Sequence, residues 1–136
     1  MTTLTKQAQL AAELEANLPY FTGTESYTNL RYPWLRTRFL LTDGAKHLAE
    51  KAKAYWLMDA IASHQTNPKV AAEEFQFWKL EVNEKHAAVL TCTDGNEKQL
   101  VRQEIPYTTF PLNSITLYAT QDESLGGLVV MLTSEY

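Results

Sequence analysis

The sequence predicts an α+β fold: an antiparallel four- to five-stranded meander sheet, with a long helix packed on one face and an N-terminal helix. Apolar residues recur with the helical period in the first half of the chain. From Phe75 onward the period changes to two, which is typical of half-buried strands. The links between these strands are short, so antiparallel neighbours are favoured.

The chain has 136 residues, of which 45% are hydrophobic and 21% charged. These values are typical of one globular domain with its own core. We expect a single domain over residues 1–136, in four parts: a peripheral helix at 1–18, an aromatic-rich loop at 19–41, a main helix at 42–66 and the sheet at 75–134.

The N-terminal helix is expected over residues 4–17. Leu10, Leu14 and Leu18 recur every four residues, and Pro19 follows the end. Because this apolar stripe is narrow, the helix should dock on the surface of the domain.

The main helix is expected as one continuous element over about residues 43–65. Thr42 or Asp43 offers an N-cap oxygen, and Pro68 stops the helix. The second half, from Ala54, is apolar on all sides, so it should be buried under other structure.

The strands are expected in FQFWKLEV and AAVLTCT, where apolar residues alternate, and then in KQLVRQEI, SITLYAT and LVVMLTS. The triplet DGN at residues 94–96 predicts a hairpin turn, because glycine and asparagine accept positive φ. Pro106 ends the strand that returns from this turn.

The charge of the chain is uneven. The net charge is −4, which argues against general nucleic-acid binding, yet residues Arg31 to Lys53 contain six basic and two acidic side chains. This stretch therefore carries +4 and the remainder −8. Two interpretations stay open: the basic stretch binds an anionic partner, or it pairs with the protein's own carboxylates.

The candidate binding residues lie in the sequence YTNLRYPWLRTRF, residues 27–39, called here the aromatic–basic segment. They are Arg31, Trp34, Arg36 and Arg38. Arginine and tryptophan dominate interface hot spots, and interleaved aromatic and basic residues also stack on bases. The alternative is that the aromatic side chains cover the core while the arginines meet internal acids.

Asp59 is predicted to be a buried, structural polar residue. On a helical wheel continued from the start of the main helix, it falls between Leu48 and Ala52 in the core-facing stripe. A buried carboxylate needs donors, which Arg36, Arg38 or loop N–H groups would supply. The functional alternative is a general acid or base in a pocket.

No catalytic residue, metal site or cofactor is predicted. His47, His64 and His86 lack metal-ligand spacing, and Cys92 reads as a small buried hydrophobe rather than a nucleophile. The sequence has no GxSxG, GxGxxG or P-loop motif. A single cysteine, no signal-peptide pattern and no apolar run of membrane length predict a cytoplasmic protein without membrane contact.

The motifs FTGTESY, LLTDGAKHLAEKAKAYWLMDAIAS, FQFWKL, LTCTDGN, IPYTTFPL and the terminal SEY occur in this order. Over about residues 20–136 the chain resembles an uncharacterised family of small bacterial proteins, a domain of unknown function found on chromosomes, plasmids and phages. The resemblance implies a bacterial or phage origin. The family has no established activity, so it implies no catalytic residues.

The sequence therefore favours a small non-enzymatic interaction or accessory module, a monomer or weak homodimer, that binds a protein through the aromatic–basic segment. One alternative is a hydrolase-like enzyme that uses Asp59 with Arg36 or Arg38 and a histidine. The other is a nucleic-acid-binding accessory protein.

Overall fold

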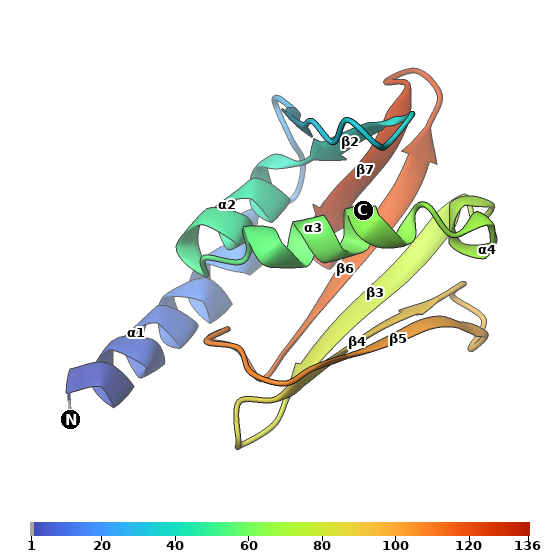
Figure 1. Cartoon of the computed structure of the whole chain (residues 1–136). Coiled ribbons are helices and arrows are strands. Elements are labelled where there is room, and N and C mark those ends of the chain that lie inside the picture. The colour runs from blue at the N-terminus through green and yellow to red at the C-terminus, as the bar shows by residue number, and fades with distance from the viewer. Residues whose placement is uncertain (1) are drawn as a thin grey trace.

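The structure is a computed structural model that describes residues 2–136. A seven-stranded sheet lies at its centre, with helices packed on one face (Figure 1). The strands are β1 (Thr28–Leu30), β2 (Arg38–Leu41), β3 (Phe75–Val82), β4 (Ala88–Thr93), β5 (Gln99–Ile105), β6 (Ser114–Asp122) and β7 (Gly127–Leu132). Their order is β1-β2-β7-β6-β3-β4-β5, and every neighbouring pair is antiparallel except β2–β7, which is parallel.

The α+β class is confirmed, but the predicted four- to five-stranded antiparallel meander is wrong. After β5 the chain returns to the far side of β3, so that β6 lies between β3 and β7. Two further strands, β1 and β2, lie within residues 19–41, where only an irregular loop was expected. In β2, Phe39, Leu40 and Leu41 are all buried, so this strand shows no alternation that reveals it in the sequence.

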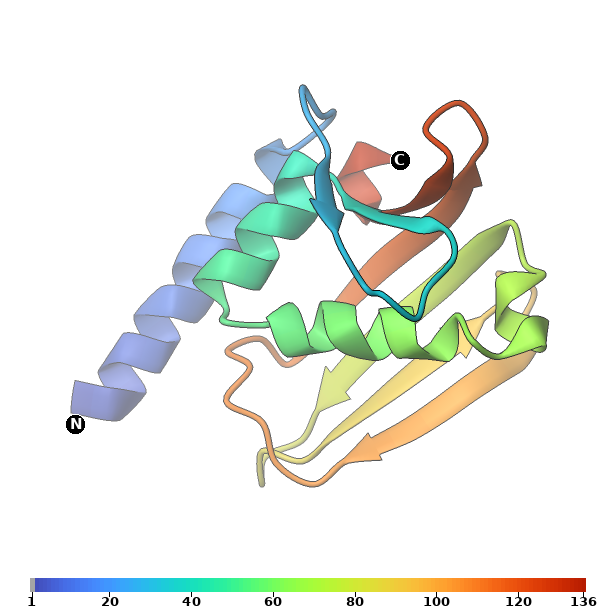
Figure 2. The same ribbon diagram turned by 45° about the horizontal axis from the view of Figure 1, so that its top comes forward.

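The helices are α1 (Thr2–Asn17), η1 (Leu18–Tyr20), α2 (Asp43–Lys51), α3 (Tyr55–His64), α4 (Pro68–Ala71) and η2 (Thr133–Glu135). α1 lies alongside α2, as expected of a docked surface helix (Figure 2). No helix within residues 2–136 combines the length and the apolar character needed to cross a bilayer.

The prediction of one continuous main helix is wrong, because the chain turns between α2 and α3. Lys53 has a φ of 52°, in the left-handed region. The amide of Ala54 donates to the Ala49 carbonyl at 2.8 Å, and that of Lys53 to the Glu50 carbonyl at 3.4 Å. This is a Schellman motif, which ends a helix. Its left-handed position holds lysine instead of glycine, so the sequence carried no stop signal.

The core lies between α2, α3 and one face of the sheet. The predicted alternation is confirmed in β3 and β4: Trp78, Leu80, Leu90 and Cys92 all point into this core. Burial, with a smaller contribution from Glu73, raises the pKa of the Cys92 thiol from its ordinary 9.0 to about 12.

The raised pKa of the Cys92 thiol predicts a loss of stability at alkaline pH. As the pH rises above 9.0, the Cys92 thiol ionises in the unfolded chain but not in the folded one. The free energy of unfolding therefore falls with rising pH until the pH reaches the folded pKa of about 12. We expect the melting temperature to fall more steeply for the wild type than for Cys92→Ala between about pH 8 and pH 10. Equal slopes would show that the thiol ionises equally in both states.

Candidate functional site

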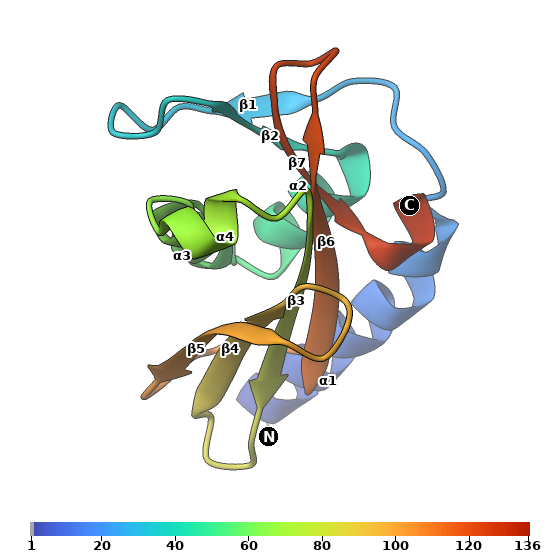
Figure 3. The ribbon, with the colours of Figure 1, turned by 90° about the vertical axis from the view of Figure 1, so that its right-hand side faces the viewer.

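The aromatic–basic segment forms a β-hairpin at one end of the sheet. β1 and the start of β2 are its two arms, and residues between them extend over α3 (Figure 3). A turn closes through the Leu35 amide, which donates to the Tyr32 carbonyl at 2.9 Å. At the base, the Gly126 carbonyl accepts from the Thr37 hydroxyl at 3.4 Å and from the Arg38 amide at 3.5 Å. The hairpin is therefore attached to the turn between β6 and β7.

Tyr32 fixes the hairpin to the helical layer. Its ring packs edge-on against Phe39, with centroids 5.6 Å apart, and tilted against Trp34 at 5.1 Å. Its hydroxyl donates to the Asp59 Oδ1 atom of α3 at 2.5 Å. Burial, followed by this hydrogen bond, raises the pKa of Tyr32, so the hydroxyl stays protonated and remains a donor at neutral pH.

The prediction that Asp59 is buried is wrong, because its side chain is exposed. The helical wheel was continued through Lys53, where the chain turns, and α3 begins a new axis. On α3, Asp59 shares the solvent side with Tyr55 and Ser63, four residues before and after it. The expectation that Asp59 accepts a hydrogen bond from the preceding segment is confirmed, but within residues 2–136 the donor is Tyr32 rather than Arg36 or Arg38.

Removal of the hydrogen bond between Tyr32 and Asp59 should cause a moderate loss of stability. Tyr32→Phe keeps the ring but deletes the donor, so we expect the free energy of unfolding to fall by about 1 kcal/mol. Asp59→Ala should cost a similar amount, and the double variant should cost less than the two single losses added. Urea unfolding of all four proteins measures this coupling. Fully additive losses would mean that the hydrogen bond does not stabilise the fold.

The four predicted binding residues are all exposed, with half of the Trp34 surface accessible (50%). Arg31, Arg36 and Arg38 line a shallow hollow of about 340 Å³ on the hairpin. The structure thus brings the three arginine residues to one surface feature. That this surface binds a partner stays a prediction.

The arginines of the aromatic–basic segment carry unneutralised charge. The ion pairs among residues 2–136 join Lys46 to Glu50, Lys79 to Glu81 and Arg102 to Glu104. None of them includes a hairpin arginine. The alternative interpretation, in which these arginines pair with the protein's own acids, therefore has no ion pair to support it in the described chain.

The hairpin also forms an edge of the sheet. β1 pairs with β2 on one side and, within residues 2–136, with no strand on the other. Backbone N–H and C=O groups along such an edge can accept a further strand. β5 forms the opposite edge, and its Arg102 is paired with Glu104.

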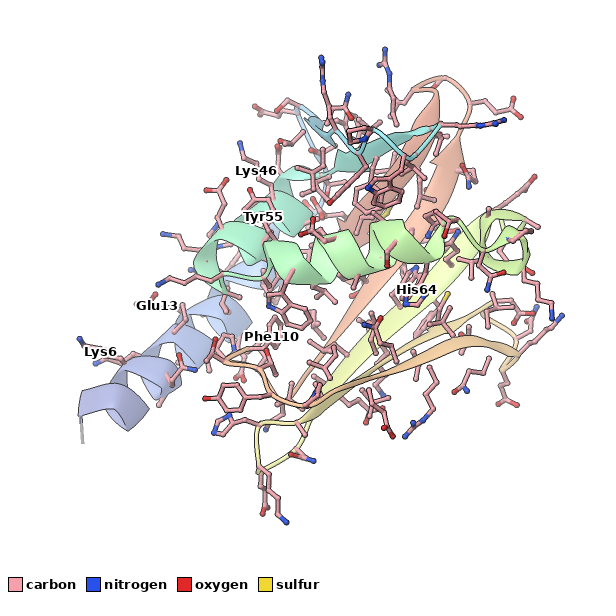
Figure 4. All side chains as sticks on the ribbon, viewed as in Figure 1. Lys6, Glu13, Lys46, Tyr55, His64 and Phe110 are labelled. Carbon is pink, nitrogen blue, oxygen red and sulfur yellow. The ribbon has the colours of Figure 1, made fainter. Side chains whose placement is uncertain are left out.

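The residues of the hydrolase alternative, Asp59 with Arg36 or Arg38 and a histidine, do not come together in the structure. His64 lies on the same helix but faces the sheet, where its Nε2 atom is 2.7 Å from Gln103 Oε1 (Figure 4). Among residues 2–136, neither Arg36 nor Arg38 forms a hydrogen bond or ion pair with Asp59. The same part of the chain has no cluster of three or more histidine, cysteine, aspartate or glutamate side chains suited to a metal ion.

Comparison with known protein families gives a match over most of the chain. A family model described as a family of unknown function, DUF6876, matches residues 12–136. Searches of curated proteins and of solved structures found no significant match.

Proposed function

The chain belongs to the family of unknown function DUF6876, and from its own geometry we propose that it is a small non-enzymatic interaction module. Its aromatic–basic segment binds an extended, acidic stretch of a protein partner. The observation that carries this proposal is the group of three exposed arginines, free of ion pairs in the described chain, beside an open strand edge.

Charge complementarity supports an acidic partner. The aromatic–basic segment contains three arginines and no acidic residue, so it carries +3; the whole chain carries −4, so the remainder carries −7. The hairpin is thus a positive patch on an acidic protein. Such a patch attracts an anionic segment, and the surrounding negative charge repels an anion that approaches elsewhere.

The open edge of β1 supports an extended partner. A peptide that lies beside Thr28–Leu30 can form main-chain hydrogen bonds as an added strand. Tyr27, next to β1, and Trp34, in the turn of the hairpin, have 43% and 50% of their surfaces exposed and offer aromatic contact area. Acidic side chains of the peptide would then reach Arg31, Arg36 and Arg38.

The same features favour a protein segment over a nucleic acid. Proteins that bind DNA through its backbone neutralise several phosphates with lysine and arginine side chains, about 6–10 in strongly salt-dependent cases. Here the unpaired arginines number three, and a long polyanion would also pass over a chain remainder of charge −7. A short acidic peptide avoids this repulsion.

We place this activity in the bacterial cytoplasm, for a protein of bacterial or phage origin. The single cysteine, Cys92, is buried and free, which fits a reducing compartment. The resemblance of residues 20–136 to small bacterial proteins supports the same origin.

The test uses a fluorescent peptide of alternating valine and glutamate, with a valine–lysine peptide and a single-stranded oligonucleotide as comparisons. In anisotropy titrations the acidic peptide should bind, and Arg31→Glu/Arg36→Glu/Arg38→Glu should weaken binding by about tenfold or more. The triple variant should keep its melting temperature to within a few degrees, because the three side chains are exposed.

A matched control changes the net charge equally at exposed lysines away from the hairpin: Lys69→Glu/Lys85→Glu/Lys98→Glu. This variant should bind the acidic peptide almost as the wild type does. If both triple variants weaken peptide binding equally, the net charge of the protein rather than the hairpin arginines explains the binding. Tighter binding of the oligonucleotide than of the peptide would favour the nucleic-acid alternative.

A further inference from the structure

A second surface feature lies far from the aromatic–basic segment. A hollow of about 450 Å³ opens between α1, the turn that joins α2 to α3, and the loops that follow β3 and β5. A neighbouring hollow of about 300 Å³ shares Lys53 and Tyr107 with it and reaches Trp56. The two together are called here the basic hollow. Figure 4 shows Lys6 near the N-terminal end of α1 and Phe110 on the loop that follows β5.

The basic hollow is positively charged. Lys6, Lys53 and His86 line it, and no aspartate or glutamate does so among the residues described. Residues 1–5 contain no acid either. Neither lysine takes part in an ion pair within residues 2–136. A chain with a net charge of −4 thus keeps cations together at this hollow.

The backbone is unusual at two residues of the hollow, Lys53 and His86. Within residues 2–136, three residues other than glycine have a positive φ, and two of them are Lys53 at 52° and His86 at 63°. Glycine adopts this conformation at lower cost than any residue with a Cβ atom. The chain instead carries a lysine and a histidine there, and both side chains line the same hollow. Strained positions of this kind cluster at binding sites.

The rest of the lining combines apolar and aromatic side chains with Gln7, Thr108 and Thr109. Tyr107 is 65% exposed, and its ring lies 6.0 Å from that of His86. Leu10 and Trp56 supply apolar surface to the two parts of the hollow. The Gln7 side chain donates to the Thr109 carbonyl at 3.0 Å and so joins α1 to the loop that carries Tyr107. A flat ligand body therefore has an aromatic surface available for stacking.

We propose that the basic hollow binds a small organic phosphate with a planar aromatic body. Lys6, Lys53 and His86 hold the phosphate by charge-assisted hydrogen bonds, and Tyr107 stacks on the aromatic body. This site is independent of the acidic peptide proposed for the aromatic–basic segment.

The left-handed positions permit a variant that removes charge without harm to the fold. Lys53→Gly/His86→Gly deletes both side chains and places glycine where positive φ favours it. Its melting temperature should equal or exceed that of the wild type. Glu97→Gly is the matched control, because Glu97 is the third such residue, with φ 69°, and does not line the hollow.

The experiment measures binding of adenosine 5′-monophosphate and phenyl phosphate by calorimetry, with adenosine and inorganic phosphate as fragments. At least one aromatic phosphate should bind, and its fragments should bind about tenfold more weakly or worse. Lys53→Gly/His86→Gly should lose about tenfold or more of this affinity, and Glu97→Gly should lose none. The proposal would be overturned if neither aromatic phosphate binds, or if they bind no more tightly than their fragments. Unchanged affinity in Lys53→Gly/His86→Gly would overturn it as well.

Discussion

Gly127→Ala is expected to lower the free energy of unfolding by about 3 kcal/mol, as a strongly overpacked core position does. Gly127 is buried and pairs with Arg38 where β7 meets β2. A Cβ atom there would lie 2.6 Å from the Arg38 carbonyl oxygen and 2.7 Å from its Cβ atom. Because the first contact is with backbone, relief requires β2 to move away from β7, and the aromatic–basic segment to move with it.

Urea unfolding measures this loss, and Gly23→Ala is the control. A Cβ atom at Gly23 would meet nothing within 4 Å, so that variant should stay within about 0.5 kcal/mol of the wild type. Hydrogen exchange at the Arg38 amide should also become faster in Gly127→Ala. A loss below about 1 kcal/mol would show that β2 and β7 are not packed as closely as described.

Glu135→Ala is expected to cost about 2–3 kcal/mol, because it leaves buried donors without an acceptor. One oxygen of the Glu135 carboxylate accepts from the Thr42 hydroxyl at 2.6 Å and from the Leu132 amide at 2.9 Å. The other accepts from the Gly44 amide at 3.0 Å. The carboxylate thus joins the C-terminal end of the chain to the N-terminus of α2, where the helix dipole favours negative charge.

The matched variants separate these contributions. Glu135→Gln keeps one acceptor oxygen and should lose less than Glu135→Ala. Glu123→Ala removes an exposed carboxylate and should change the free energy of unfolding by less than about 0.5 kcal/mol. If Glu135→Ala and Glu123→Ala unfold at the same urea concentration, the C-terminal contact does not stabilise the fold.

The sequence predicted the strands β3 to β6 from polar and apolar residues that alternate along them, and β7 from a short run of apolar residues that proves almost wholly buried. The DGN turn is confirmed as well: Gly95 has a φ of 87°, and Asp94 accepts from the Asn96 amide at 2.7 Å. β2 could not be found in either way, since it has only four residues and its consecutive buried residues lack alternation. The order of the strands could not be found either, because the pairing of β2 with β7 joins segments about 90 residues apart.

The site was predicted in part. A segment rich in charge predicts exposed side chains, and this holds for Arg31, Trp34, Arg36 and Arg38. The burial predicted for Asp59 depended on one continuous helix, and the structure has two, α2 and α3. Lysine at the left-handed position gave no sign of the break. The basic hollow was missed because it combines single residues from four distant segments, and no local pattern unites them.

The measurement that tests the central claim most directly is an NMR titration of the ¹⁵N-labelled protein with the acidic valine–glutamate peptide. Binding at the aromatic–basic segment should shift the amide signals of residues 27–39 and slow hydrogen exchange along Thr28–Leu30, where the added strand pairs. The opposite edge, Gln99–Ile105, should be unaffected. Shifts confined to that opposite edge, or no shifts at saturating peptide, would contradict the assignment of the hairpin as the binding surface.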